Sequence, residues 1–140
     1  MSNQTNYTRI RITKVLILHL STNDIDWGSR NPQTTCNPGV NNGSFVNISL
    51  DVNSNDADGI YLRGTDLTNS SYSIGIGNVT WAKANLCTNG YNLNSSWAKI
   101  RNFTASGTSQ QTYFWIDIPA VPALRYHGYT YVMANTSSSG

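Results

Sequence analysis

Two cysteines, Cys36 and Cys87, are the residues with the most distinctive chemistry in this 140-residue chain. Both stand in segments rich in Asn, Thr and Gly, where a free thiol would be vulnerable in an oxidising compartment. We therefore expect one disulfide between them. Two reduced thiols are the alternative, because the spacing of cysteines does not establish the geometry of a bond.

Residues that could perform acid–base or nucleophilic catalysis are few. The sequence has two histidines, His19 and His127, seven aspartates and no glutamate. Neither histidine accompanies a nucleophile motif or a second ligand at zinc spacing. We therefore expect no enzyme, no catalytic residue and no cofactor.

Residues 51–59 are rich in the oxygen ligands that calcium prefers. They begin like an EF-hand loop, but Asp56 stands where that loop needs glycine and Leu62 where it needs a bidentate glutamate. An EF-hand is excluded on these grounds. We expect a polar hairpin turn and no metal site, with an irregular calcium site as the alternative.

Two charges interrupt apolar segments, Lys14 near the N-terminus and Asp117 near the C-terminus. Buried lone charges are costly, so buried partners would need each other. The pattern is similar to that of Gram-positive pilins, in which a first-strand Lys is joined to a late-strand Asn beside an acid. That similarity makes Lys14, Asp117 and Asn135 candidates for an isopeptide bond, with an ordinary ion pair or partial exposure as the alternative.

Asparagines in the triplet Asn-X-Ser/Thr, with X not proline, are acceptors for N-linked glycans. Nine occur, at Asn3, Asn6, Asn42, Asn47, Asn69, Asn78, Asn94, Asn102 and Asn135. The Ser and Thr content predicts about four by chance. The excess indicates a glycan-coated surface, while accidental triplets in an Asn-rich chain are the alternative.

Composition favours strands over helices. Charged residues make up 11% of the chain and only three are lysines, so surface helix formers are scarce, whereas Tyr, Thr, Ile, Val and Trp are plentiful. The net charge of +2 comes from scattered residues, which does not favour a nucleic-acid partner. The sequence shows neither a run of about 18 apolar residues nor a signal peptide, so we expect no membrane span, and secretion would imply a mature chain.

The first strong strand signal covers residues 9–20. Its alternation places Ile10, Ile12, Leu16, Leu18 and Leu20 on one face. The second half of this segment is apolar on both faces, which indicates burial on both sides. A polar stretch with Gly and Pro follows, so residues 21–43 are expected to be a hinge or loop region between an N-terminal strand region, 1–20, and the body.

Six further alternating segments divide the body, at residues 44–52, 59–63, 72–81, 97–104, 112–118 and 126–134. In the first of them Val46, Ile48, Leu50 and Val52 are expected to face inward. Clusters of Asn, Asp, Gly and Ser separate the segments. Seven or eight short strands at this spacing predict an all-β fold, a single jelly-roll or immunoglobulin-like β-sandwich with its body at residues 44–140.

Aromatic residues allow two interpretations. Four tryptophans, Trp27, Trp81, Trp97 and Trp115, and eight tyrosines could line a sugar-binding platform. Sandwich cores and protein interfaces use the same residues, and we favour that interpretation.

Residues 112–119, Thr-Tyr-Phe-Trp-Ile-Asp-Ile-Pro, are followed by Pro122 and by Arg-Tyr-His-Gly-Tyr-Thr at 125–130. This pattern resembles the closing hairpin of archaeal cell-surface sandwich domains, and residues 61–66 and 76–81 look similar too. Some archaeal extracellular filaments, like bacterial biofilm-matrix fibres, are strings of such sandwiches in which each N-terminal strand completes a neighbour. The resemblance implies that residues 9–20 form a donor strand, with pairing inside the same domain as the alternative.

Together these features predict an extracellular structural subunit. We expect a glycosylated filament or surface-layer protein that forms a homopolymer by strand addition and has an adhesion or biofilm role. The alternatives are a monomeric carbohydrate-binding sandwich and a viral jelly-roll coat protein.

Overall fold

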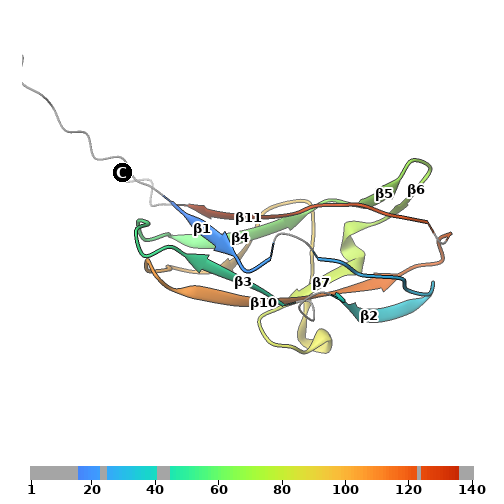
Figure 1. The fold of residues 1–140 in the computed structure, drawn as a ribbon, viewed down its shortest axis with the longest axis horizontal. Helices are drawn as coiled ribbons and strands as arrows, with labels where there is room; N and C mark the ends of the chain where they lie inside the picture. The colour runs from blue at the N-terminus through green and yellow to red at the C-terminus, as the bar shows by residue number, and fades with distance from the viewer. Residues whose placement is uncertain (1–15, 23–24, 41–44, 123, 136–140) are drawn as a thin grey trace, which may run out of the picture.

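The computed structural model describes residues 16–22, 25–40, 45–122 and 124–135, which form an almost entirely β structure (Figure 1). The strands of this part of the chain are β1 (Leu18–Leu20), β2 (Thr34–Pro38), β3 (Phe45–Leu50), β4 (Gly59–Gly64), β5 (Leu67–Asn69), β6 (Tyr72–Ile74), β7 (Val79–Ala82), β8 (Tyr91–Asn92), β9 (Ala98–Arg101), β10 (Ser109–Ile118) and β11 (Thr130–Asn135). Two 3₁₀ turns, η2 (Ile76–Asn78) and η3 (Cys87–Asn89), interrupt them. The expected all-β fold class is confirmed. The described residues contain no helix with the length and apolar character required to cross a membrane.

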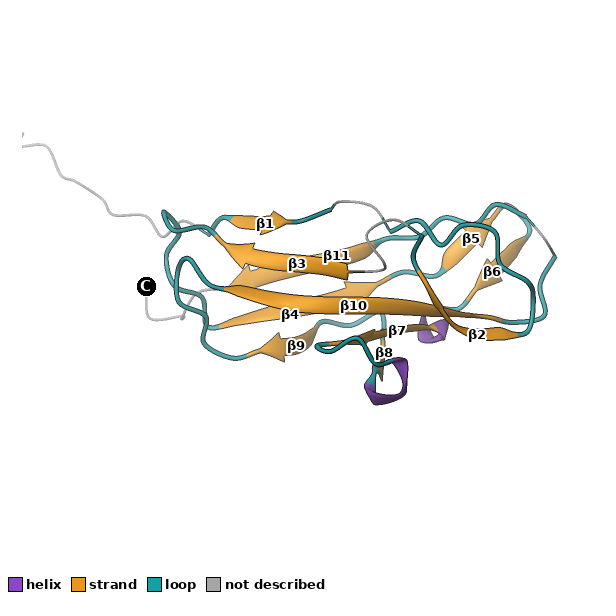
Figure 2. Cartoon of the chain, turned by 60° about the horizontal axis from the view of Figure 1, so that its bottom comes forward, coloured by secondary structure: helices purple, strands orange, loops and turns teal. Residues whose placement is uncertain are grey.

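The strands form three antiparallel sheets. The largest has the order β1-β3-β10-β7-β8, with β2 pairing with the C-terminal half of β10; the second has the order β11-β4-β9; and β5 with β6 makes a hairpin. Figure 2 shows the first two sheets as layers, with β3 and β10 in one and β4 and β11 in the other. A single cluster of buried side chains joins these layers, because it contains Ile48 and Phe114 from the large sheet and Ile60 and Leu62 from the small one.

Strand alternation decides which side chains enter this core. In β3, Val46, Ile48 and Leu50 are buried, whereas the residues between them are half-buried on the opposite face. In β10 the same alternation sends Thr112 and Phe114 inward. The buried Thr112 hydroxyl donates a hydrogen bond to the carbonyl of Val46 at 2.7 Å, so its burial leaves no unsatisfied donor.

Val52 departs from the expected inward alternation. β3 ends at Leu50, and the Ser54 N–H donates to the carbonyl of Asp51 at 3.0 Å, which closes a turn. The turn carries Val52 outward, where its side chain is 75% exposed. The expectation for Val52 is therefore wrong, because the turn ends the two-residue period of the strand.

The expected hinge or loop region contributes a strand of its own. β2 lies within residues 21–43 and pairs with β10, where Asn37 is opposite Ile116. The register shifts at Asp117, whose carboxylate accepts the Cys36 N–H at 2.8 Å. This hydrogen bond holds Cys36 at a φ of +52°, a conformation that non-glycine residues seldom adopt. Alternation could not reveal β2, because Thr-Thr-Cys-Asn-Pro contains none.

Cys36 and Cys87 form the expected disulfide, with their Cα atoms 5.9 Å apart. The bond joins β2 to η3, and these elements flank β10 because β2 pairs with one side of that strand and η3 follows β7 on the other. The two cysteines are 51 residues apart in sequence. Such a disulfide is typical of proteins that fold outside the reducing cytosol.

The structure divides the expected strands more finely than alternation did. Residues 72–81 separate into β6 and β7 around η2. β10 begins at Ser109, three residues before the start of the expected segment 112–118. β11 begins at Thr130, four residues after the start of the expected segment 126–134. β5 and β8 have only three and two residues, which is too short for a period to appear.

Reduction of the disulfide should lower the free energy of unfolding by about 4 kcal/mol, the chain-entropy value for a loop of this length. Urea denaturation with and without a phosphine reductant measures the difference. The Cys36→Ser/Cys87→Ser variant is the control, since reductant should not change its stability. Equal stability of the oxidised and reduced wild-type chain would contradict a stabilising role for the bond.

Candidate functional site

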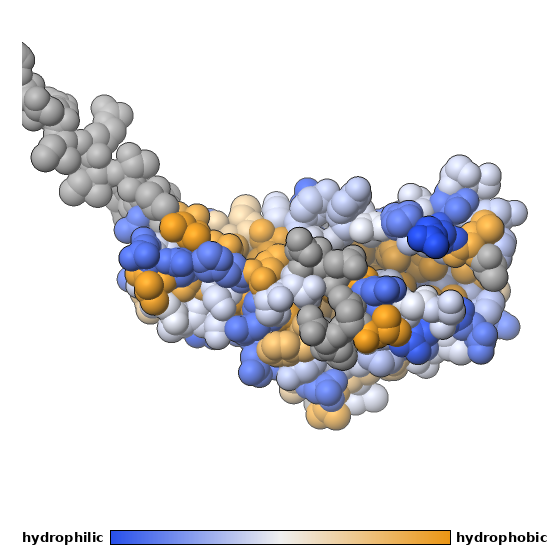
Figure 3. Space-filling model, in the orientation of Figure 1, coloured by the Kyte–Doolittle hydropathy of each residue, from blue (hydrophilic) through white to orange (hydrophobic). Residues whose placement is uncertain are grey.

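The N-terminal strand region enters the described structure as β1, which lies at the edge of the large sheet. β1 pairs antiparallel with β3, with Leu18 opposite Leu50 and Leu20 opposite Ile48. Leu16 and Leu18 are half-buried, and Leu20 is 42% exposed. Hydrophobic residues are visible at the surface where β1 lies (Figure 3). Ile10 and Ile12, the other residues expected on the donor face, lie outside the described residues.

The register of β1 shows where backbone pairing between β3 and the N-terminal segment ends. Among the described residues, the last backbone bond at this end of β1 runs from the Asp51 N–H to the carbonyl of Ile17, at 3.0 Å. β3 ends at Leu50, and the chain then turns away. Consequently β3 offers no partner residue to the positions that precede Ile17 in an antiparallel register.

Side chains fasten β1 at this end of the sheet. His19 Nε2 donates to the Asp51 carboxylate oxygen Oδ2 at 2.7 Å. The Ile17 N–H donates to Ser54 Oγ at 3.1 Å. The backbone N–H of Asn53, together with the His19 ring, holds the pKa of the Asp51 carboxyl below its usual range. These contacts fix the beginning of β1 to the turn at residues 51–54.

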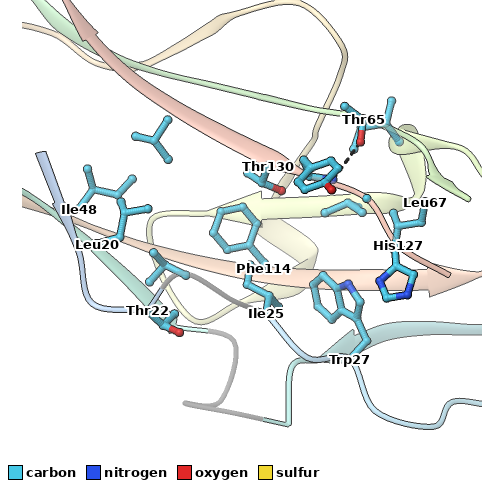
Figure 4. Close-up of a pocket in the computed structure, with 16 residues that line it drawn as sticks. Leu20, Thr22, Ile25, Trp27, Ile48, Thr65, Leu67, Phe114, His127 and Thr130 are labelled. Atoms are coloured by element: carbon cyan, nitrogen blue, oxygen red, sulfur yellow. Dashed lines mark hydrogen bonds between the residues drawn. The ribbon is translucent and has the colours of Figure 1, made fainter. Parts of the chain in front are cut away.

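A cavity of about 380 Å³ opens between the two sheets on the side where β1 and β11 are the edge strands. Figure 4 shows Phe114 in the middle of its lining, between Leu20 and Ile48 on one side and Leu67 and Trp27 on the other. Most of the lining is apolar, and its sixteen residues come from both sheets and from the segment after β1. Apolar surface of this kind is stabilised by contact with other apolar groups.

Some of the polar groups that line the cavity are engaged in hydrogen bonds with the backbone. The Thr65 hydroxyl accepts the Tyr129 N–H at 2.9 Å, drawn as the dashed line in Figure 4. Backbone hydrogen bonds of 2.7 and 3.0 Å join His127 to Thr68. The lining therefore favours an apolar occupant and offers little for recognition of a polar small molecule.

Most of the described aspartates bind backbone N–H groups. Carboxylate oxygens accept backbone N–H groups in these pairs: Asp26 with Gly28, Asp51 with Asn53, Asp56 with Ser106, Asp66 with Ile76 and Asp117 with Cys36. Within the described ranges no three His, Cys, Asp or Glu residues come together as a metal site. His19 and His127 lie on different elements, β1 and the segment before β11.

Asp117 and Asn135, two of the three isopeptide candidates, do not meet. Asp117 is near the end of β10 and Asn135 is the last residue of β11. Figure 1 shows that β10 and β11 end at opposite ends of the molecule. The three candidates therefore do not share one site, and the first of them, Lys14, lies outside the described residues.

The described glycan-acceptor asparagines differ in accessibility. Asn94 and Asn102 are exposed. Asn47, Asn69, Asn78 and Asn135 are half-buried, and the side-chain oxygens of Asn47 and Asn135 are buried without a hydrogen-bond partner. The amide nitrogens of Asn69 and Asn78 donate to the carbonyls of Arg125 and Gly75, at 2.9 and 3.1 Å. Asn3, Asn6 and Asn42 lie outside the described residues.

The tryptophans divide between core and surface. Trp81 and Trp115 are buried, and Trp27 lines the cavity. Trp97 is 40% exposed and lies beside Arg63 on the outer face of the small sheet. Arg63 was not among the predicted site residues, although alternation in residues 59–63 places it on the face opposite Ile60 and Leu62.

No protein-family model matches the chain, and it matches neither a curated protein nor a solved structure. The chemistry of its surfaces is therefore the basis for assigning a function.

The contact between His19 and Asp51 predicts that stability depends on pH. Because the pKa of Asp51 is lowered by folding, its contribution to stability is present above the usual carboxyl range and is lost as the pH falls through the lowered value. A carboxyl NMR titration should place Asp51 below its ordinary pKa. His19→Ala should return the Asp51 pKa only partway, because the Asn53 N–H remains.

His127→Ala is the matched control, since His127 makes no contact with Asp51. It should leave the Asp51 titration unchanged. An unaltered Asp51 pKa in His19→Ala would show that the histidine does not contribute.

Proposed function

We propose that this chain is an extracellular structural subunit that assembles by β-strand addition. In this assembly residues 9–16 of one copy, which precede the bonded Ile17, bind at the open side of a second copy, between its β1 and β11 edges. The observation that carries the proposal is the register of β1, since β3 has no partner for the alternating segment that precedes Ile17.

The acceptor side has the two features that strand addition requires. β11 is the last strand of its sheet among the described residues, so its outer edge is unpaired there. An added strand gains main-chain hydrogen bonds at such an edge, while alternate side chains enter pockets. The neighbouring apolar cavity supports this role, because Ile10 and Ile12 of the donor share one face and can enter it together. Lys14 stands next on the same face, and its long side chain would extend out of the cavity to solvent.

Strand addition also suits the compartment that the disulfide indicates. Filament subunits outside the cell cannot depend on a reducing cytosol or its chaperones, and a covalent bond between β2 and η3 stabilises each subunit independently. The arrangement supports a homopolymer in which each sandwich-like body accepts one strand and donates another. A surface-layer, adhesion or biofilm role would follow from such a polymer.

Replacing the donor face should abolish assembly. Ile10→Asp/Ile12→Asp puts charges on the side chains that enter the cavity, and burial of unpaired charge is costly. Light scattering after size exclusion and negative-stain electron microscopy should show concentration-dependent polymers for wild type and monomers for this variant. Arg9→Ser/Arg11→Ser changes the opposite face and should still assemble.

Two outcomes would overturn the proposal. One is a wild-type chain that stays monomeric at every concentration. The other is loss of the near-UV circular dichroism spectrum in the Ile10→Asp/Ile12→Asp variant, which would show that the segment pairs within its own chain. A synthetic peptide of residues 9–16 should cap wild-type polymers and shorten them.

Glycan occupancy tests the surface role separately. Asn94 and Asn102 are the exposed acceptors among the described residues and should carry glycans in material from the native host. Asn94→Gln and Asn102→Gln should each lower the intact mass by one glycan. Asn47→Gln is the matched control, because its half-buried amide lies on β3, and it should leave the glycan mass unchanged.

A further inference from the structure

The outer face of the β11-β4-β9 sheet carries an ordered array of aromatic and cationic side chains. Strand register sets Tyr131 opposite Arg63 and Met133 opposite Tyr61, and it sets Tyr61 opposite Lys99 on the third strand. These residues alternate with buried Leu62 and its neighbours, so they point away from the core. We define Tyr61, Arg63, Trp97, Lys99, Tyr129 and Tyr131 as the outer array.

Arg63 lies at the centre of the outer array. Its guanidinium carbon is 4.3 Å from the ring centroid of Tyr131 and 5.0 Å from that of Trp97. Cation–π contacts involve the ring faces and not the N–H donors of the guanidinium. Two rings therefore hold Arg63 in place, and no hydrogen bond from its guanidinium to another described residue competes with an acceptor in solution.

Exposed ring surface extends on both sides of Arg63. Tyr129 is 68% exposed and stacks on Tyr131 with ring centroids 6.1 Å apart. Trp97 is 40% exposed and Tyr131 is 39% exposed. Rigid aromatic rings supply contact area at low entropic cost.

The described carboxylates do not neutralise the positive charges of Arg63 and Lys99 in the outer array. β4, β9 and β11 contain no acidic residue. Neither Arg63 nor Lys99 forms an ion pair with a described carboxylate, and the Lys99 ammonium lies 5.7 Å from the Tyr61 ring centroid. A ligand for this face should therefore carry negative charge.

We infer that the outer array binds an acidic polysaccharide. Trp97 and Tyr129 stack against the apolar faces of sugar rings, while Arg63 pairs with a carboxylate or sulfate group on the chain and Lys99 adds a second positive charge. Arg is suited to such planar oxyanions because its donors bind them in pairs. This site does not depend on strand addition, since Arg63, Trp97, Lys99 and Tyr131 take no part in the lining of the cavity, and Tyr129 alone belongs to both.

Single-stranded nucleic acid also stacks on aromatic rings, but it requires a basic groove that follows every phosphate. The outer array has two cations, and the net charge of the whole chain is only +2. The observations therefore favour a sugar chain with occasional acidic groups.

Titration calorimetry with the full chain tests this site, using polygalacturonate, heparin oligosaccharides, neutral dextran and oligothymidylate as probes. Polygalacturonate should bind if the acidic group is a carboxylate, heparin if it is a sulfate, and dextran should bind weakly or not at all. Arg63→Gln and Trp97→Ala should each weaken binding about tenfold or more, the loss expected for one charge-assisted contact or one stacked ring. Arg63→Lys should lie between Arg63→Gln and wild type.

Salt dependence separates the two kinds of contact. Arg63→Gln should reduce the loss of affinity that added NaCl causes, whereas Trp97→Ala should lower affinity without changing that dependence. Lys83→Gln and Tyr72→Ala are matched controls, because both residues are exposed and lie outside the outer array. They should change affinity by less than about twofold.

The inference fails if neither polyanion binds, if oligothymidylate binds as tightly as the acidic sugars, or if the control variants lose as much affinity as Arg63→Gln. It also fails if the outer-array variants change the oligomeric state in light scattering without changing sugar binding, since the face would then be a contact between copies. Unchanged far-UV circular dichroism and cooperative thermal unfolding show that the variants retain the fold.

Discussion

Strand β10 pairs with three other strands, and its inward side chains supply the middle of the core. β3 and β2 follow each other along one side of it and β7 lies along the other, so its ten residues set the register of the large sheet. Phe114 reaches both the core and the wall of the cavity. A shift of one residue would exchange these side chains with those on the other face, which are Gln111, Tyr113 and Trp115. The bond from Thr112 to Val46 opposes such a shift.

The strand order around β10 also explains why the molecule is open on one side. The large sheet extends from β10 through β3 to β1, and β1 contributes only three residues. The small sheet ends at β11 on that side. Two edges of unequal length leave the cavity between them, and this asymmetry is what an added strand could complete. The far side is different, because there the disulfide holds the segment after β7 against its neighbours.

Residue pattern predicted the parts of the fold that depend on alternation. The core positions of β3 and the strand character of β4, β9 and β10 followed from period-two hydrophobicity, and the disulfide followed from the environment of two cysteines. Pattern did not predict β2, whose pairing depends on a bulge at Cys36 and on a carboxylate 81 residues away in sequence. It also did not predict the outer array, because stacking of Trp97 on Arg63 depends on how β9 registers against β4, and register is a tertiary property.

The disulfide has a mechanical consequence. It closes a loop that contains β3, β4, β5, β6 and β7, which together supply much of both layers. When the two ends of the chain are pulled apart, tension passes from Cys36 directly to Cys87 and bypasses everything between them. The enclosed strands cannot be drawn out while the bond is intact. A subunit under load can therefore extend only through its terminal segments, and it keeps a covalently bounded centre around which those segments can fold back.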